Sequence, residues 1–224
     1  EHLTFFYPGS PDPVFEDAAF QIDTRWRLGL IGRNGRGKTT LLRLLMGEYP
    51  HEGTLAASES FGYFPSPVPK PERLTAEVLE DLCPDAESWR FPKELGLLGV
   101  EEEDLWRPFS TLSGGERTKA LLAALFLQEG RFPLIDEPTN HLDSQGRELA
   151  AAYLRRQRGF LLVSHDRRFL DGCVDHILAL NRSDIQVQAG NYSSWRDNFD
   201  RFQQFEEAKD ERLRKDVRRL QKAA

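Results

Sequence analysis

The sequence predicts an α/β fold with a β-rich N-terminal part, a small helical subdomain and a long C-terminal helix. Compact apolar runs at 132–135 and 160–163 are typical of buried parallel strands, and the stretch 145–156 between them has a helical pattern, which predicts a βαβ unit. A stretch of alternating prolines divides the N-terminal part from several short helices. The last segment, from Arg196, is rich in charge and free of glycine and proline, so it should be one helix.

The composition limits the class of protein. The 224 residues fit one sizeable domain with an appendage, and 39% hydrophobic with 29% charged residues exclude a disordered chain and a membrane protein. Apolar runs such as 121–127 are far shorter than the roughly 20 residues that cross a bilayer. With no signal-peptide pattern, we expect a soluble, cytoplasmic protein in which Cys83 and Cys173 are reduced core thiols. The net charge of −6 argues against broad, charge-driven binding to nucleic acid.

Short β-rich runs alternate with turn residues in the N-terminal part. We expect strands at 3–7, 14–22 and 26–31. The leucines in 39–46 and the Gly47 that follows them predict a helix over 39–46. The order is therefore strand, glycine-rich loop, helix.

The middle of the chain begins with a connector. Prolines at every second position over 65–71 exclude a helix and a central strand there. Short helices broken by proline and glycine should fill 74–109, and a strong helix should run over 117–128. Because proline cannot donate a ladder hydrogen bond, we expect the next strand to begin at Leu134, after Pro133.

The C-terminal segment 196–224 carries nine Lys or Arg and seven Asp or Glu, and seven of the basic residues lie in 209–222. A thin apolar stripe runs from Phe199 to Leu220 without a cap, so we expect the helix to continue further. The basic part predicts a local cationic surface, which is either a solvated helix face without a partner or a surface that binds RNA.

Residues 32–39 read Gly-Arg-Asn-Gly-Arg-Gly-Lys-Thr, which satisfies the pattern G-x-x-x-x-G-K-[ST] between a predicted strand and a predicted helix. The glycines let backbone N–H groups surround an anion at the helix N-terminus. The lysine reaches the terminal phosphates, and the threonine hydroxyl ligates Mg²⁺. The pattern predicts a nucleoside triphosphate site built from Gly32, Asn34, Gly35, Gly37, Lys38, Thr39 and Thr40.

Two adjacent carboxylates, Asp136 and Glu137, follow the strand that should begin at Leu134. Open α/β sheets bind ligands at the carboxyl ends of their parallel strands. Asp136 would hold Mg²⁺ through water, and Glu137 would polarise the attacking water of an in-line phosphoryl transfer. Glu137 is therefore a predicted catalytic residue.

The segment Leu112-Ser113-Gly114-Gly115-Glu116 precedes the helix expected over 117–128. Ser113 and Glu116 have the spacing of a capping box. The two glycines also leave bare N–H groups that can meet a phosphate on another surface. Phosphate donors so far along the chain from the glycine-rich loop indicate a composite site.

Together these motifs resemble the ATP-binding cassette (ABC) ATPases over roughly residues 3–195. In that family they are the Walker A sequence (32–39), the signature sequence (112–116), the Walker B sequence (134–137) and the D-loop (140–143). The resemblance implies that His165 contacts the γ-phosphate as a catalytic residue, and that Tyr7 stacks on adenine.

The resemblance also implies an organisation and a chemistry. It implies a P-loop NTPase cassette over 1–195, with a helical subdomain at about 72–128, followed by the start of a charged helical linker at 196–224. ATP and Mg²⁺ are the implied cofactors, and ATP hydrolysis would need Ser113, Gly114 and Gly115 of a second cassette. Where many cassettes have a glutamine that senses Mg²⁺, this chain has Ser66, whose shorter hydroxyl would act through a water.

Within the family, residues 136–143 resemble the ABC-F class, soluble proteins with two cassettes joined by a helical linker that enters the ribosome. The run 25–38 further resembles bacterial antibiotic-resistance members that protect ribosomes, although housekeeping translation factors share most of these residues. The implied partners are a second cassette and the ribosome with its rRNA. The alternative is the ATPase subunit of a membrane transporter, bound to a membrane subunit, which a glutamine at position 66 would favour.

Overall fold

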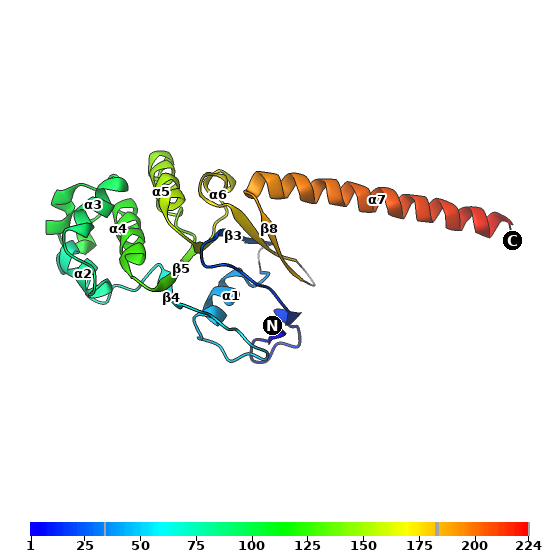
Figure 1. The fold of residues 1–224 in the computed structure, drawn as a ribbon, viewed down its shortest axis with the longest axis horizontal. Helices are drawn as coiled ribbons and strands as arrows, with labels where there is room; N and C mark the ends of the chain where they lie inside the picture. The colour runs from blue at the N-terminus through cyan, green and yellow to red at the C-terminus, as the bar shows by residue number, and fades with distance from the viewer. Residues whose placement is uncertain (34, 182–183, 224) are drawn as a thin grey trace.

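The computed structural model describes residues 1–33, 35–181 and 184–223, with side chains up to residue 209. A six-stranded sheet forms its centre, in the order β4-β5-β6-β3-β7-β8 (Figure 1). Neighbouring strands are parallel except for β8, which runs antiparallel to β7. The strands are β3 (Arg27–Gly32), β4 (Ser60–Phe64), β5 (Arg131–Asp136), β6 (Phe160–Val163), β7 (His176–Leu180) and β8 (Ile185–Ala189).

Both faces of this sheet are covered. Helix α1 (Lys38–Leu45) and a two-stranded sheet of β1 (Leu3–Phe5) and β2 (Phe15–Ala18) share one core with the sheet, and α4 (Gly114–Leu127), α5 (Ser144–Arg156) and α6 (Arg167–Cys173) share the other. Alternate residues of β6 enter opposite cores: Leu161 joins the first and Leu162 the second. Double burial explains why the central strands are apolar at nearly every position.

The predicted βαβ unit is confirmed, because β5 and β6 are parallel neighbours joined through α5. The expected start of β5 at Leu134 is wrong, since the strand begins at Arg131 and includes Pro133. Pairing with β6 begins only at Leu134, whereas β4 already pairs with the strand from Arg131. A missing N–H donor is tolerated at Pro133 because only one neighbour is paired there.

A helical lobe follows the proline-rich connector (Figure 1). It consists of α2 (Thr75–Leu82), α3 (Arg90–Leu97), two short 3₁₀ helices, Glu102–Trp106 and Phe109–Thr111, and α4. The capping box is confirmed: Glu116 N–H donates to Ser113 Oγ at 3.2 Å, and Ser113 N–H donates to Glu116 Oε2 at 2.7 Å. This cap begins α4 at Gly114, three residues before the expected start.

The C-terminal helix α7 (Tyr192–Ala223) begins four residues before the expected Arg196. Its first turn is capped by Asn191, whose Oδ1 accepts from Ser194 N–H at 3.0 Å, and by Asp171 of α6, whose Oδ1 accepts from Ser193 N–H at 2.8 Å. Beyond this anchored end the helix projects away from the body (Figure 1). From residue 210 on, the basic segment 209–222 lies outside the residues whose side chains are described.

Several smaller expectations can be compared with the structure. The strands expected at 3–7 and 14–22 form but are shorter, and the strand expected at 26–31 forms one residue later, as β3. Both cysteines are buried and free, as expected. The strands β4, β7 and β8 and the helix α6 were not individually predicted. Within the described part of the chain, no helix is both long and apolar enough to span a membrane.

Candidate functional site

The glycine-rich loop joins β3 to α1. Gly35 and Gly37 have φ angles of 78° and 86°, a left-handed conformation that favours glycine. A Cβ at Gly37 would also lie 2.5 Å from Val14 Cγ1, so the loop is closely packed there. Asn34, another predicted member of the site, lies outside the described residues. The loop thus presents backbone N–H groups at the start of α1, the arrangement that holds phosphates.

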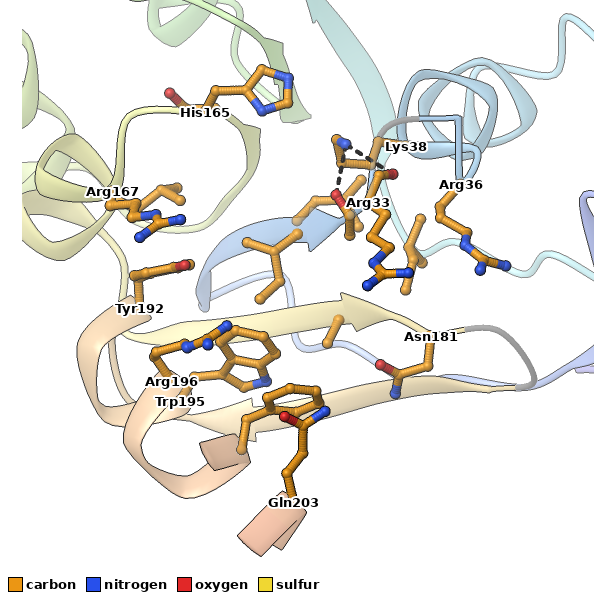
Figure 2. Close-up of a pocket in the computed structure, with 18 residues that line it drawn as sticks. Arg33, Arg36, Lys38, His165, Arg167, Asn181, Tyr192, Trp195, Arg196 and Gln203 are labelled. Atoms are coloured by element: carbon orange, nitrogen blue, oxygen red, sulfur yellow. Dashed lines mark hydrogen bonds between the residues drawn. The ribbon is translucent and has the colours of Figure 1, made fainter. Parts of the chain in front are cut away.

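Lys38 is the lysine of this loop. Its Nζ donates to the carbonyl oxygens of Gly32 at 2.9 Å and Arg33 at 3.4 Å (Figure 2). Partial burial lowers the pKa of Lys38, while the carboxylates of Glu137 and Asp136 oppose this effect. The ammonium group therefore lies at the loop and within the field of both predicted acidic residues.

Asp136 lies at the end of β5, opposite the first turn of α1. Its Oδ2 accepts hydrogen bonds from Thr39 Oγ1 at 3.0 Å and from Tyr63 Oη at 3.1 Å. Burial and the nearby Asp136 carboxylate raise the pKa of Tyr63 to about 12, so the phenol keeps its proton and donates. A hydroxyl beside one carboxylate fits Mg²⁺, which proteins hold with few side chains plus phosphate oxygens and waters.

Glu137 adopts a left-handed φ of 51°, which is uncommon outside glycine. Its N–H donates to Val163 O at 2.9 Å, which ties the turn after β5 to the end of β6. The carboxylate accepts from His165 N–H at 3.3 Å, and its Oε1 lies 3.3 Å from His165 Nε2. Burial raises the pKa of Glu137, and the charge of His165 opposes that shift. A carboxylate with a raised pKa beside an imidazole is suited to accept a proton from water.

Tyr7 lies beside the same helix. Its hydroxyl is 2.7 Å from Thr40 Oγ1, and Phe5 and Tyr49 contact its ring edge to face with centroids 5.1 Å and 5.9 Å away. The residue remains 40% exposed. Tyr7 is therefore held next to the loop with surface free for stacking.

The signature segment lies in the helical lobe, and Figure 1 shows α4 and α1 in different parts of the molecule. A Cβ at Gly114 would lie 3.4 Å from His141 Cβ, and one at Gly115 would lie 3.3 Å from His141 O. The segment 140–143 thus packs against the signature glycines, and Asp143 then caps α5 by accepting from Gly146 N–H at 2.7 Å. Among described residues, no hydrogen bond or ion pair joins 113–115 to the loop 32–39.

Ser66 begins the connector to the helical lobe. Its Oγ donates to Tyr63 O at 2.9 Å, the carbonyl of the residue whose side chain contacts Asp136. Tyr63 is a site residue that no sequence motif predicted. Its only signal was its place three residues before Ser66, because the pairing of β4 with β5 was not predicted.

A pocket of about 740 Å³ extends from the glycine-rich loop to the start of α7. Figure 2 shows the cationic side chains of the pocket in two places: Arg33, Arg36 and Lys38 on the side of the loop, and Arg167 and Arg196 beside Tyr192 and Trp195. Arg167 lies 5.6 Å from the Tyr192 ring centroid, a cation–π distance. The first turns of α7 therefore form one wall of the cavity that also contains Lys38 and His165.

A glycine-rich loop at a helix N-terminus, a Thr39–Asp136 pair and a partly buried Glu137 facing His165 define a P-loop ATPase cassette. Residues 15–140 match the family model described as ABC transporter. This match covers more than half of the chain, so the chain belongs to the ABC family.

Two named relatives show which members of the family this chain is similar to. The chain is 32% identical over 188 residues to ABC transporter F family member 5 of Arabidopsis thaliana, covering 80% of this chain and 27% of the relative. It is 34% identical over 187 residues to the ribosome protection protein VmlR of Bacillus subtilis, covering 82% of this chain and 34% of the relative. The chain is thus similar to one cassette of these relatives, the first of which is named a member of the ABC transporter F family, and it spans about a third or less of their length.

A solved structure supports the fold. The dimeric structure of a bacterial ABC transporter cassette superimposes with a TM-score of 0.69 at 17% identity. The superposition covers 84% of this chain and 97% of that chain. The α/β cassette fold expected from the sequence is confirmed.

Proposed function

We propose that this chain is the ATP-binding and ATP-hydrolysing cassette of a cytoplasmic ABC-F protein that acts on the ribosome. The observation that carries the proposal is the convergence of Lys38, Thr39, Asp136, Glu137 and His165 at the carboxyl ends of β3, β5 and β6. These residues are far apart in sequence, and together they supply the groups that phosphoryl transfer requires.

The phosphates lie on the N–H groups of the loop, with Lys38 exchanging its carbonyl contacts for phosphate oxygens. Mg²⁺, held by Thr39 and by Asp136 through water, would neutralise charge on these oxygens. Glu137 takes a proton from the attacking water, and its raised pKa suits that role. His165 orients Glu137 and reaches the γ-phosphate, while Tyr7 stacks on adenine.

The site is completed by a second cassette. Ser113, Gly114 and Gly115 lie in the helical lobe and make no hydrogen bond to the glycine-rich loop within the described residues. A second cassette would bring an equivalent signature segment to this P-loop, and the dimeric cassette with the same fold supports that arrangement.

The ribosome is the proposed partner because VmlR, a relative at 34% identity, is named a ribosome protection protein. Protection against an antibiotic is the finer form of this proposal. The projecting helix α7 supports a linker at 196–224 after the cassette 1–195, whose helical subdomain occupies about 72–128.

Co-sedimentation tests the proposal. The full-length protein carrying Glu137→Gln should accumulate with ATP bound and sediment with ribosomes at physiological salt, since lower salt lets any basic patch bind RNA. A Lys38→Ala variant, which loses a charge-assisted phosphate contact, should not. Absence of ribosome binding together with recovery in a membrane complex would favour a transporter ATPase instead.

A further inference from the structure

Strand β4 places a phenol in the metal site. Tyr63 lies near the end of β4, which pairs with β5 in the register Tyr63 to Leu134 and Phe64 to Ile135. The register puts Tyr63 close to the carboxyl end of β5, where Asp136 lies. Its ring is half-buried and packs against the core around α1, so only its hydroxyl reaches the site.

Two donors converge on one oxygen of Asp136. Thr39 Oγ1 and Tyr63 Oη both donate to Oδ2, at 3.0 Å and 3.1 Å. Among the described residues, no hydrogen bond reaches Oδ1, which remains an acceptor for a water ligand of Mg²⁺. Thr39 Oγ1 can donate this hydrogen bond and still direct a lone pair at a metal ion. The hydroxyl of Tyr63, in contrast, would donate to the carboxylate without ligating the ion.

Tyr63 also connects this carboxylate to the helical lobe. The Ser66 hydroxyl donates to the carbonyl oxygen of Tyr63 at 2.9 Å. Ser66 opens the connector that leads to α2, so connector, Tyr63 and Asp136 form one hydrogen-bonded chain.

We propose that Tyr63 is a positioning residue of the metal site, which fixes the Asp136 carboxylate for Mg²⁺ and joins it to the connector of the helical lobe. The inference rests on the proposed ATPase function. The Tyr63 hydroxyl donates a hydrogen bond to the carboxylate that would hold the ion. Such a hydrogen bond fixes the orientation of the carboxylate and strengthens metal binding.

The Tyr63→Phe variant tests this role, because it removes the hydroxyl and keeps the ring. Binding of a fluorescent ATP analogue to the full chain should be measured with EDTA and across a Mg²⁺ titration. Without Mg²⁺, Tyr63→Phe should bind the analogue like the parent. Its half-saturating Mg²⁺ concentration should rise about tenfold, as expected for loss of one hydrogen bond to a charged group, and excess Mg²⁺ should restore parental affinity.

Tyr153→Phe is the matched control. It also removes one tyrosine hydroxyl, but Tyr153 lies on α5 in the other core, and its hydroxyl has no hydrogen-bond partner among the described residues. This control should show the parental Mg²⁺ dependence. Melting temperatures of both variants separate a loss of fold from a loss of metal affinity.

The outcomes are distinct. An unchanged Mg²⁺ titration in Tyr63→Phe would overturn the role of Tyr63 and leave the ATPase proposal standing. Weaker analogue binding in EDTA, or a loss that excess Mg²⁺ does not restore, would also overturn it, because it would indicate a general structural effect. A parent that binds no nucleotide would overturn both proposals.

Discussion

At the scale of the residue, Glu137 carries two unfavourable features at once. Its backbone is in the left-handed region, which costs conformational energy. Its carboxylate is partly buried beside the carboxylate of Asp136, which costs electrostatic energy. Its position after β5 and the bond from its N–H to Val163 O impose this conformation. Strain of this kind clusters where a side chain must be held for chemistry.

The Glu137→Gln variant should lose hydrolysis and gain stability. Removing the base should lower the hydrolysis rate by about 10² or more while ATP still binds. Burial raises the folded-state pKa of Glu137, so its ionisation destabilises the fold as pH rises through that pKa. The nucleotide-free variant should therefore melt at a higher temperature than the parent at neutral pH, and this gain should vanish in acid, where the parent's carboxyl is protonated.

Single-turnover hydrolysis and melting curves at neutral and acidic pH check both effects. Glu80→Gln is the control, because Glu80 is an exposed residue of α2 and lies outside both the P-loop site and the signature segment. Parental turnover by Glu137→Gln would show that another group activates the water.

At the scale of the element, local motifs were predictable and pairings between distant segments were not. The glycine-rich loop and the Ser113 capping box each lie within a few residues of sequence, so their patterns are explicit. The Tyr63–Asp136 contact depends on β4 lying beside β5, which no local pattern shows. The start of α7 was placed too late for the same reason, since Asp171 of α6 helps to cap it.

The Asp171→Ala variant should loosen the first turn of α7. Asp171 accepts from both the N–H and the hydroxyl of Ser193, so the variant should lose about 1 kcal/mol of stability, the usual value of a cap. Amide exchange over 192–199 should become faster, while ATP binding stays parental because the loop 32–39 is untouched. Asp197→Ala, an exposed change on the same helix, is the control. Equal exchange rates in the two variants would show that Asp171 does not anchor α7.

At the scale of the whole molecule, the chain holds two half-sites that do not meet. The P-loop, Asp136 and Glu137 lie at the central sheet, whereas the signature glycines lie in the helical lobe (Figure 1). The D-loop segment 140–143 packs against those glycines and follows directly from the Walker B turn. A partner cassette bound at the signature glycines would therefore lie close to the segment 140–143, which continues directly from the turn that holds Asp136 and Glu137.

Mixing two defective variants tests this composite site. Lys38→Ala disables the P-loop and Ser113→Arg blocks the signature, so each variant alone should hydrolyse ATP poorly. In a mixed pair, the intact P-loop of one copy meets the intact signature of the other. Random pairing should then restore up to about a quarter of parental activity, because half of the pairs are mixed and each has one intact site of two.

Steady-state phosphate release against total chain concentration measures this recovery, and the parent's activity per chain should rise with concentration. An inactive mixture of variants that still pair, or efficient hydrolysis by a parent that stays monomeric, would show that the signature segment serves its own chain.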